Sequence, residues 1–260
     1  METTLDLKED LHISANSKLA DYVLMAELFN YPYNNSYPEK IREIQEYLTA
    51  NIPASAEVMS RFVEFVNTST LQEMQELFLR SFDVQAITTL DIGFILFGED
   101  YKRGQLLVNL NREHREAGNI CETELSDHLP NVLRLLPKMK HEDIRNEIAL
   151  RLLIPAVVKM IDEFDNKKIE KKDEVYKKHL KTVIDYSATY RTVYQTLLQA
   201  LFIALKNDFG YDPANAVGTG PQQTETNEFT CSGKSASCSC DSNTGDFSTN
   251  IETELNIEKQ

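Results

Sequence analysis

Asp127 and His128 are the neighbouring pair in this sequence best suited to moving protons. A carboxylate beside an imidazole can act as general acid and base, or can bind a basic peptide. Neighbours on a helix point about 100° apart, so adjacency does not show that the two side chains cooperate. The alternative is structural: Ser126 or Asp127 caps a helix that begins here, and His128 is partly exposed.

A second candidate is the run Tyr101-Lys102-Arg103-Gly104, which places two cations and a glycine early in a predicted helix. Glycine inside a helix costs about 1 kcal/mol relative to alanine. We therefore expect Gly104 to have a packing reason, such as the close approach of another backbone. For Lys102 and Arg103 the alternative interpretation is a solvated charged turn.

Three of the four cysteines, Cys231, Cys238 and Cys240, cluster near the C-terminus, and Cys121 lies alone. The clustered thiolates could bind zinc, copper(I) or an iron–sulfur cluster if a fourth ligand were supplied. The repeated Cys-x2-Cys spacing of structural zinc sites is absent. A metal-binding or redox-sensing module is thus an alternative function, and cysteines without a role are equally compatible with the pattern.

Motifs of known enzyme classes are missing from the sequence. It contains no G-x-G-x-x-G, phosphate-binding loop, G-x-S-x-G or H-E-x-x-H motif. His141-Glu142-Asp143 resembles the start of a metalloprotease helix, but Arg145 stands where the second histidine is needed. We expect a protein that is not an enzyme and carries no cofactor of its own.

The formal net charge is −14, from 41 acidic and 27 basic residues. Such a chain repels a phosphate backbone, so nucleic acid is not an expected partner. The acidic surface could serve solubility alone, or could attract a basic peptide. No run of about 18 apolar residues and no basic, then apolar, N-terminus is present, which predicts a soluble cytoplasmic protein without a membrane segment.

Helical periodicity with recognisable ends dominates the first 210 residues and predicts an all-α bundle of about nine or ten helices. The predicted ends are a cap at Ser55, a Thr70–Glu73 capping box, Pro38 in a first turn, a cap at Ser126, a stop at Pro137, a kink at Pro155, and C-terminal glycines at Gly118 and Gly210. The dense apolar segment 87–97 fits a buried helix or a short strand, and we favour the helix. The charged stretch 161–178 is interpreted as a solvated linker or an exposed helix end.

Tyr186, Tyr190 and Tyr194 recur every four residues in the last predicted helix. Their rings could line a groove for a partner helix or could belong to the core. The resulting organisation is a flexible N-terminus at 1–16, a helical domain at 17–210 and an acidic, disordered tail at 211–260.

Residues 94–136 resemble the delta-subunit chaperones of respiratory nitrate reductases, the NarJ branch of the redox enzyme maturation chaperones that also include TorD and DmsD. The likeness lies in Gly98, Arg103-Gly104, the spacing of Leu106, Leu107 and Leu110, Ala117-Gly118, and Glu124-Leu125 followed by Asp127-His128-Leu129-Pro130. The last run is similar to the family's E-L-P-D-H-L-P signature, with Ser126 in place of the proline.

This resemblance implies an all-helical cytosolic chaperone, a monomer or weak dimer. Its partner would be the N-terminal segment of the apo catalytic subunit of a molybdenum-containing, nitrate reductase-like oxidoreductase, kept open until the cofactor is inserted. By position, the resemblance assigns Glu124, Asp127, His128, Leu129 and Pro130 to the peptide groove, with Tyr101, Arg103 and Gly104 at its rim.

Overall fold

The computed structural model describes residues 19–180 and 190–211, and every regular element in these ranges is a helix. The all-α prediction is therefore confirmed. The predicted flexible segment 1–16, Tyr186 and the predicted tail beyond Tyr211 lie outside the described residues. No described helix has the length and apolar character needed to cross a membrane.

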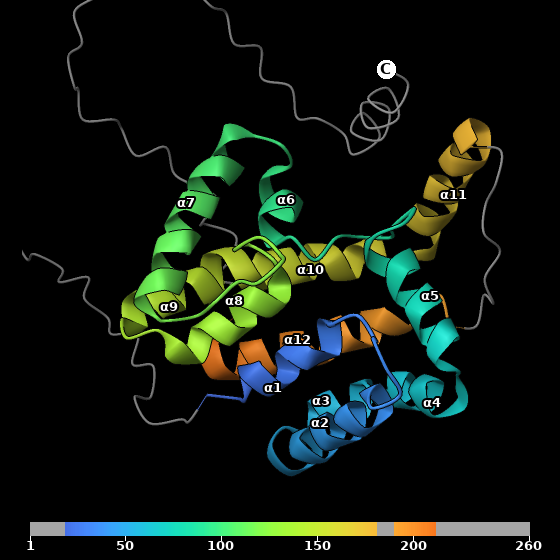
Figure 1. Cartoon of the computed structure of the whole chain (residues 1–260), viewed down its shortest axis with the longest axis horizontal. Coiled ribbons are helices and arrows are strands. Elements are labelled where there is room, and N and C mark those ends of the chain that lie inside the picture. Colours follow the sequence, from blue (N-terminus) through green and yellow to red (C-terminus); the bar gives the residue numbers. More distant parts are fainter. Residues whose placement is uncertain (1–18, 181–189, 212–260) are drawn as a thin grey trace, which may run out of the picture. The chain divides into compact units, whose positions relative to one another are not determined.

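The elements, shown in Figure 1, are α1 (Tyr22–Ala26), η1 (Glu27–Phe29), α2 (Tyr37–Asn51), α3 (Pro53–Val58), α4 (Ser60–Thr68), α5 (Leu71–Phe82), α6 (Ile92–Phe97), α7 (Tyr101–Glu116), α8 (Leu129–Leu135), η2 (Leu136–Lys138), α9 (Glu142–Ile148), η3 (Ala149–Leu153), α10 (Ile154–Glu163), α11 (Asn166–Leu180) and α12 (Val193–Phe209).

The central element is α12, which packs against α3, α4 and α10. It is apolar around most of its circumference, and nine of its side chains are buried, as expected for a helix enclosed by others. Tyr194 is among them, and Tyr190 packs against the same core, so both of these tyrosines belong to the core. Gly210 ends α12 with a left-handed φ of 61°, as predicted.

Helices α2 to α5 form the side of the bundle coloured blue to teal in Figure 1. Pro38 lies in the first turn of α2, and Thr70 and Glu73 form the predicted capping box of α5. The predicted cap at Ser55 is wrong, because α3 already begins at Pro53. The Ser55 hydroxyl instead donates a hydrogen bond of 2.9 Å to the Ala200 carbonyl on α12.

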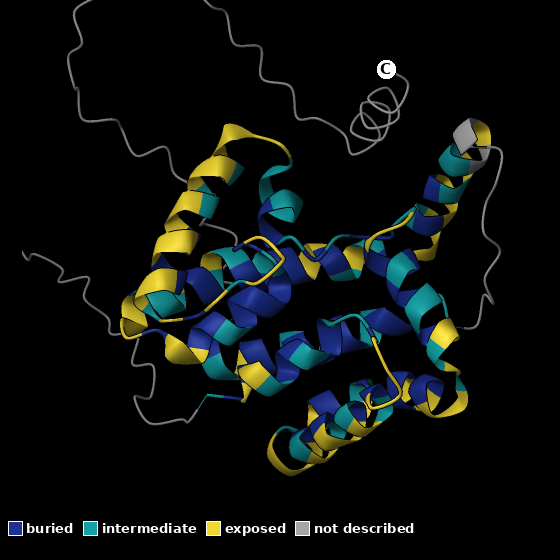
Figure 2. Cartoon of the chain, viewed as in Figure 1, coloured by how far each residue is buried: buried dark blue, intermediate teal, exposed yellow. Residues whose placement is uncertain are grey.

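The predicted buried helix at 87–97 is shorter and less buried than expected. It begins at Ile92, and only Ile92 and Gly93 are buried within α6. Gly98, with φ of 61°, ends it and allows the chain to turn into α7. The two helices pack on each other, and most of α7 is exposed (Figure 2).

The cap predicted at Ser126 is also wrong. Helix α8 begins at Leu129, with Pro130 in its first turn, and the Ser126 hydroxyl donates to the Leu107 carbonyl at 3.3 Å. The irregularity predicted at Pro155 takes the form of a π-helical segment, η3, directly before α10. Such a segment accommodates a local break in the regular hydrogen-bond ladder.

The charged stretch 161–178 is no linker, since most of it forms α11. Lys172 on this helix is buried, and its ammonium lies 2.7 Å from Oε2 of Glu163 and also contacts the Ile87 carbonyl. Ile169 is buried as well. These contacts attach the first half of α11 to the core despite its many charges.

Candidate functional site

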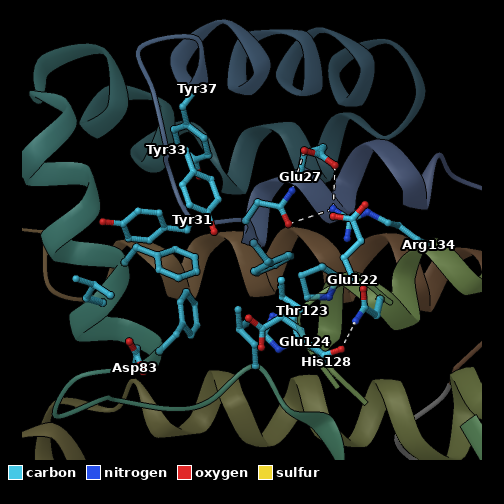
Figure 3. A pocket seen from close by; sticks show the side chains of 18 of the residues that line it. Glu27, Tyr31, Tyr33, Tyr37, Asp83, Glu122, Thr123, Glu124, His128 and Arg134 are labelled. Atoms are coloured by element: carbon cyan, nitrogen blue, oxygen red, sulfur yellow. Dashed lines mark hydrogen bonds and ion pairs between the residues drawn. The ribbon is translucent and has the colours of Figure 1, made fainter. Parts of the chain in front are cut away.

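A cavity of about 890 Å³ opens between two walls of the bundle and is here named the groove (Figure 3). One wall comes from η1, the following segment up to α2, and α5. The other comes from residues 120–134, and residues 89–91 lie between them. The side chains that matter below are Glu27, Tyr31, Tyr33, Lys40, Phe78, Phe82, Asp83, Asp91, Ile120, Glu122, Thr123, Glu124, His128, Pro130 and Arg134.

The first wall is aromatic. Tyr31 packs edge-on against Tyr33, with ring centroids 5.0 Å apart, and against Phe78 at 5.5 Å. Phe78 in turn contacts Phe82 at 5.3 Å. Rings held by such neighbours present an apolar surface with little conformational freedom left to lose on binding.

The groove is also acidic. Its lining includes five carboxylates against two side chains that always carry a positive charge: Glu27, Asp83, Asp91, Glu122 and Glu124 against Lys40 and Arg134. Arg134 is already engaged, because its Nη2 lies 3.0 Å from Oε1 of Glu27 and 3.1 Å from Oδ1 of Asn30. Glu27 is thereby paired as well, and Asp91 is paired with Arg103, which lies outside the lining. Asp83, Glu122 and Glu124 still outnumber Lys40, and this excess of negative charge favours a cationic ligand.

Two large apolar side chains at the groove are exposed to an unusual degree. Tyr33, in the aromatic wall, is 79% exposed, and Ile120, in the other wall, is 80% exposed. Exposed apolar residues on both sides of a cavity are typical of a surface that contacts another molecule.

Backbone pairing between two distant segments places a carboxyl group beside an imidazole at the groove. Ile92 N–H donates to the Asp127 carbonyl at 3.0 Å, and Leu129 N–H donates to the Leu90 carbonyl at 2.8 Å. This antiparallel bridge sets Asp91 opposite His128. The Asp91 Oδ1 then lies 3.0 Å from His128 Nδ1, and both residues line the groove.

Arg103, which projects from α7, ties this pair to Asp127. Its Nη2 donates to Asp91 Oδ2 at 2.9 Å, and its Nε donates to Asp127 Oδ2 at 3.1 Å. Burial raises the pKa of Asp127 in spite of the nearby guanidinium. Burial also opposes ionisation of Asp91, but His128 and Arg103 outweigh it and lower its pKa. The three charges thus connect α7, the segment before α6 and the turn before α8.

Gly93 makes this arrangement sterically possible. A Cβ atom at this position would lie 2.5 Å from Oδ2 of Asp127 and 3.0 Å from Cδ2 of Leu106. Sequence reasoning singled out neither Gly93 nor Asp91. Their role depends on the pairing of segments 90–92 and 127–129, and no local sequence motif predicts that pairing.

The structure separates the residues that the sequence analysis grouped into one site. Glu124, His128 and Pro130 line the groove, whereas Asp127 and Leu129 are fully buried and do not. Arg103 also lies outside the lining; it is paired with two carboxylates, so its interpretation as part of a solvated turn is wrong.

Tyr101 and Gly104 are exposed on α7, outside the groove lining. An added Cβ at Gly104 would meet no atom within 4 Å, so the packing reason expected for this glycine is wrong. The aromatic residues Tyr31, Tyr33, Phe78 and Phe82 were missed as groove residues. The helical spacing of Phe78 and Phe82 marks them only as apolar, which suits core and groove equally, and Tyr31 and Tyr33 lie in the segment between η1 and α2, where no periodicity identifies them.

Among residues 19–180 and 190–211, no three His, Cys, Asp or Glu side chains are grouped so that they could hold a metal ion. Cys231, Cys238 and Cys240 lie outside the described residues.

Neither a protein-family model nor a curated protein matches the chain.

Proposed function

We propose that the protein is a chaperone, not an enzyme, which holds a basic and partly apolar segment of another protein in the groove. Its client would be the N-terminal segment of the catalytic subunit of a molybdenum-containing, nitrate reductase-like oxidoreductase. The chaperone would keep this segment in the cytoplasm until the cofactor is inserted and the complex assembles.

The observation that carries this proposal is the union of an aromatic wall and an acidic lining in one groove. Tyr31, Tyr33 and Phe78 offer apolar contact, while Glu122 and Glu124 stand exposed on the other wall. An amphipathic helix or extended segment with basic residues satisfies both walls at once. The client's identity rests on the resemblance of residues 94–136 to the nitrate reductase chaperones.

The groove walls differ in what they contribute to binding. The aromatic wall supplies contact area and therefore affinity. The carboxylates steer a cationic segment into place and make its capture sensitive to salt. A client peptide should thus bind more weakly at high ionic strength, and a version with Lys and Arg replaced by Gln should lose most of this dependence.

A direct test is titration of the purified protein with fluorescently labelled N-terminal peptides of molybdoenzyme catalytic subunits. The matched pair of variants is Tyr33→Ala and Tyr101→Ala, because both tyrosines are almost equally exposed, at 79% and 78%, but only Tyr33 lines the groove. We expect Tyr33→Ala to weaken binding about tenfold and Tyr101→Ala to leave it unchanged.

The outcomes separate the alternatives. No binding tighter than about 100 μM with any such peptide would contradict the proposal. A loss with Tyr101→Ala and none with Tyr33→Ala would place the contact on α7, among the residues that the resemblance assigns to the rim of the groove. Replacing both Glu122 and Glu124 with Gln should lower the association rate more than it raises the dissociation rate.

A further inference from the structure

One wall of the groove is held from behind by a polar cluster, here named the histidine hub: the buried residues His114, Asn119 and Asn131, together with the exposed Lys138. His114 lies on α7 and is only 3% exposed. Its Nε2 is 3.0 Å from the Ser126 carbonyl, and its Nδ1 is 2.9 Å from Nδ2 of Asn119. The ring therefore contacts both ends of the segment from Asn119 to Ser126.

The partners of the Asn119 amide fix its orientation. Its Oδ1 accepts a hydrogen bond of 2.6 Å from the Lys138 ammonium, and its Nδ2 donates to the Asn131 carbonyl at 3.2 Å. Because Nδ2 is a donor, the Nδ1 atom of His114 must accept, and its Nε2 carries the proton that is donated to Ser126. The hub thus requires a neutral His114 in one tautomer.

Asn131 completes the support of the wall. Its side-chain Nδ2 donates to the Leu125 carbonyl at 2.9 Å and to the Glu124 carbonyl at 3.3 Å. Between the two fixed ends lie four residues of the groove lining: Ile120, Glu122, Thr123 and Glu124. Of the four hub residues only Asn131 lines the groove, whereas His114, Asn119 and Lys138 lie behind the wall and hold these side chains in place.

We propose that His114 and Asn119 are positioning residues of the groove: neutral His114 holds the wall in its binding shape, and protonation of His114 releases the wall and weakens ligand binding. The inference about binding rests on the proposed function. The inference about the wall concerns the free protein and stands apart from any ligand.

Protonation conflicts with the hub in a way that a side-chain flip cannot relieve. An imidazolium donates from both nitrogens, so its Nδ1–H would face the N–H groups of Asn119. Turning the Asn119 amide would give His114 an acceptor, but it would set the amide N–H groups against the Lys138 ammonium. Without the flip a buried donor is left without an acceptor, and with the flip Asn119 loses its bonds to the Asn131 carbonyl and to Lys138, so protonation costs free energy in either orientation.

The charged neighbours do not offset this penalty. Lys138 is the cation that acts on His114 from η2, and with burial as the first cause it holds the pKa of His114 below its usual range. Asp127, beside Ser126, is paired with Arg103, and Glu113 on the same helix is paired with Arg112. Arg115 follows His114 directly on α7.

A second cavity, of about 510 Å³, adjoins the hub. His114, Arg115, Asn119 and Cys121 line it, together with Ile120, which also lines the groove. Burial raises the pKa of the Cys121 thiol, so this group stays neutral where histidine ionises. Water reaching this cavity gives the released wall a place to move without unfolding α7.

The test uses hydrogen–deuterium exchange of the full chain without ligand, between about pH 5 and pH 8 and corrected for the intrinsic rate. We expect amides of residues 119–126 to lose protection on acidification in the wild type, while amides of α12 keep theirs. This loss of protection on acidification is here called the pH step. His114→Gln retains a neutral donor and acceptor, so it should abolish the pH step. His141→Gln, a change at an exposed histidine outside the hub, should leave the step intact.

A further variant distinguishes the hub from a general effect of a buried histidine. Lys138→Met removes the cation that opposes the flipped Asn119 amide, so a protonated His114 can be accommodated. We expect the pH step in segment 119–126 to shrink or vanish in Lys138→Met, although His114 is still present. A step that persists unchanged in both His114→Gln and Lys138→Met would overturn the inference.

The binding arm compares the affinity for one labelled basic peptide at about pH 7.5 and pH 5.5 in wild type and His114→Gln. We expect an about tenfold loss on acidification in the wild type and at most a twofold loss in the variant. His128, in the groove, is present in both proteins, so its contribution cancels. If residues 119–126 lose protection on acidification but no peptide binds at either pH, the proposed function is refuted and this inference is not. Peptide binding with a wall that keeps its protection would refute this inference alone.

Discussion

Arg103 on α7 donates from Nε to Oδ2 of Asp127 across 3.1 Å, and the Asp127 side chain is completely buried. The guanidinium also lies over the ring of Phe94, with 5.4 Å between Cζ and the ring centroid. This pair attaches the exposed helix α7 to the turn that leads into α8. The groove residue His128 follows Asp127 directly, so the geometry of the groove depends on an ion pair that lies behind it.

Arg103→Met should destabilise the protein by about 3–5 kcal/mol at neutral pH, because it leaves the carboxylate of Asp127 buried without a counter-ion. The loss should shrink on acidification, since protonation of Asp127 removes the unpaired charge. Denaturant unfolding at pH 7 and pH 4.5 measures both. Lys102→Met, a change at an exposed neighbour, should alter stability by less than about 0.5 kcal/mol. Equal effects of the two substitutions would contradict the role given to Arg103.

Asp91→Asn should cost about 1–2 kcal/mol at neutral pH, a value reduced because the side chain is partly open to solvent. His128 and Arg103 lower the pKa of Asp91, so the native state stabilises its ionised form. That contribution is complete above the ordinary aspartate pKa of about 4 and disappears as the pH falls through the lowered value. Wild type and variant should therefore converge in stability as the pH falls below the ordinary aspartate value of about 4.

The control for this pH dependence is Glu57→Gln, a change at an exposed side chain on α3. Its unfolding free energy should track that of the wild type over the same pH range. A difference between Asp91→Asn and wild type that stays constant from pH 7 to pH 3 would show that Asp91 contributes through shape and not through its charge.

Gly93→Ala and Gly104→Ala should act in opposite directions. The Cβ added at Gly93 meets Oδ2 of Asp127 at 2.5 Å, so the carboxylate must move away from Arg103. We expect a loss of about 1–3 kcal/mol from this overpacking. The Cβ added at Gly104 meets nothing within 4 Å in the first turns of α7, and there alanine should stabilise by about 0.5–1 kcal/mol. Thermal and denaturant unfolding distinguish the two signs.

Local signals could be read from the sequence, whereas tertiary ones could not. The capping box at Thr70 and the helix-ending Gly118 and Gly210 are set by residues within one turn, and all three predictions are confirmed. Ser55 and Ser126 also look like caps, but their hydroxyls donate to carbonyls of other elements, 145 and 19 residues away. A hydroxyl gives the same local signal whether its partner is near or far.

For the groove, too, local features could be predicted from the sequence and tertiary contacts could not. Its acidic side could be anticipated from Glu124 and from the net charge, but the pairing of Asp91 with His128 joins residues 37 positions apart. The aromatic wall depends on how α5 packs beside the segment at Tyr31, which apolar spacing does not encode. Arg103 appeared in the sequence as one of two adjacent cations, and only the fold shows that it, and not Lys102, holds two carboxylates.

Thr70→Ala should destabilise the protein by about 1 kcal/mol, because it removes half of the capping box of α5. In that box the Thr70 hydroxyl accepts from the Glu73 N–H at 3.3 Å, and the Glu73 carboxylate accepts from the Thr70 N–H at 2.7 Å. These bonds lower the pKa of Glu73, so its part of the cap is lost as the pH falls below its ordinary value. The cap fixes the start of α5, the helix that carries Phe78 and Phe82 into the groove wall. Helix fraying in Thr70→Ala should therefore show as faster hydrogen exchange in residues 71–75, with little change in α12. Thr70→Ser keeps the hydroxyl and should retain most of the stability, and an equal loss in Thr70→Ser would assign the effect to the methyl group instead of the cap.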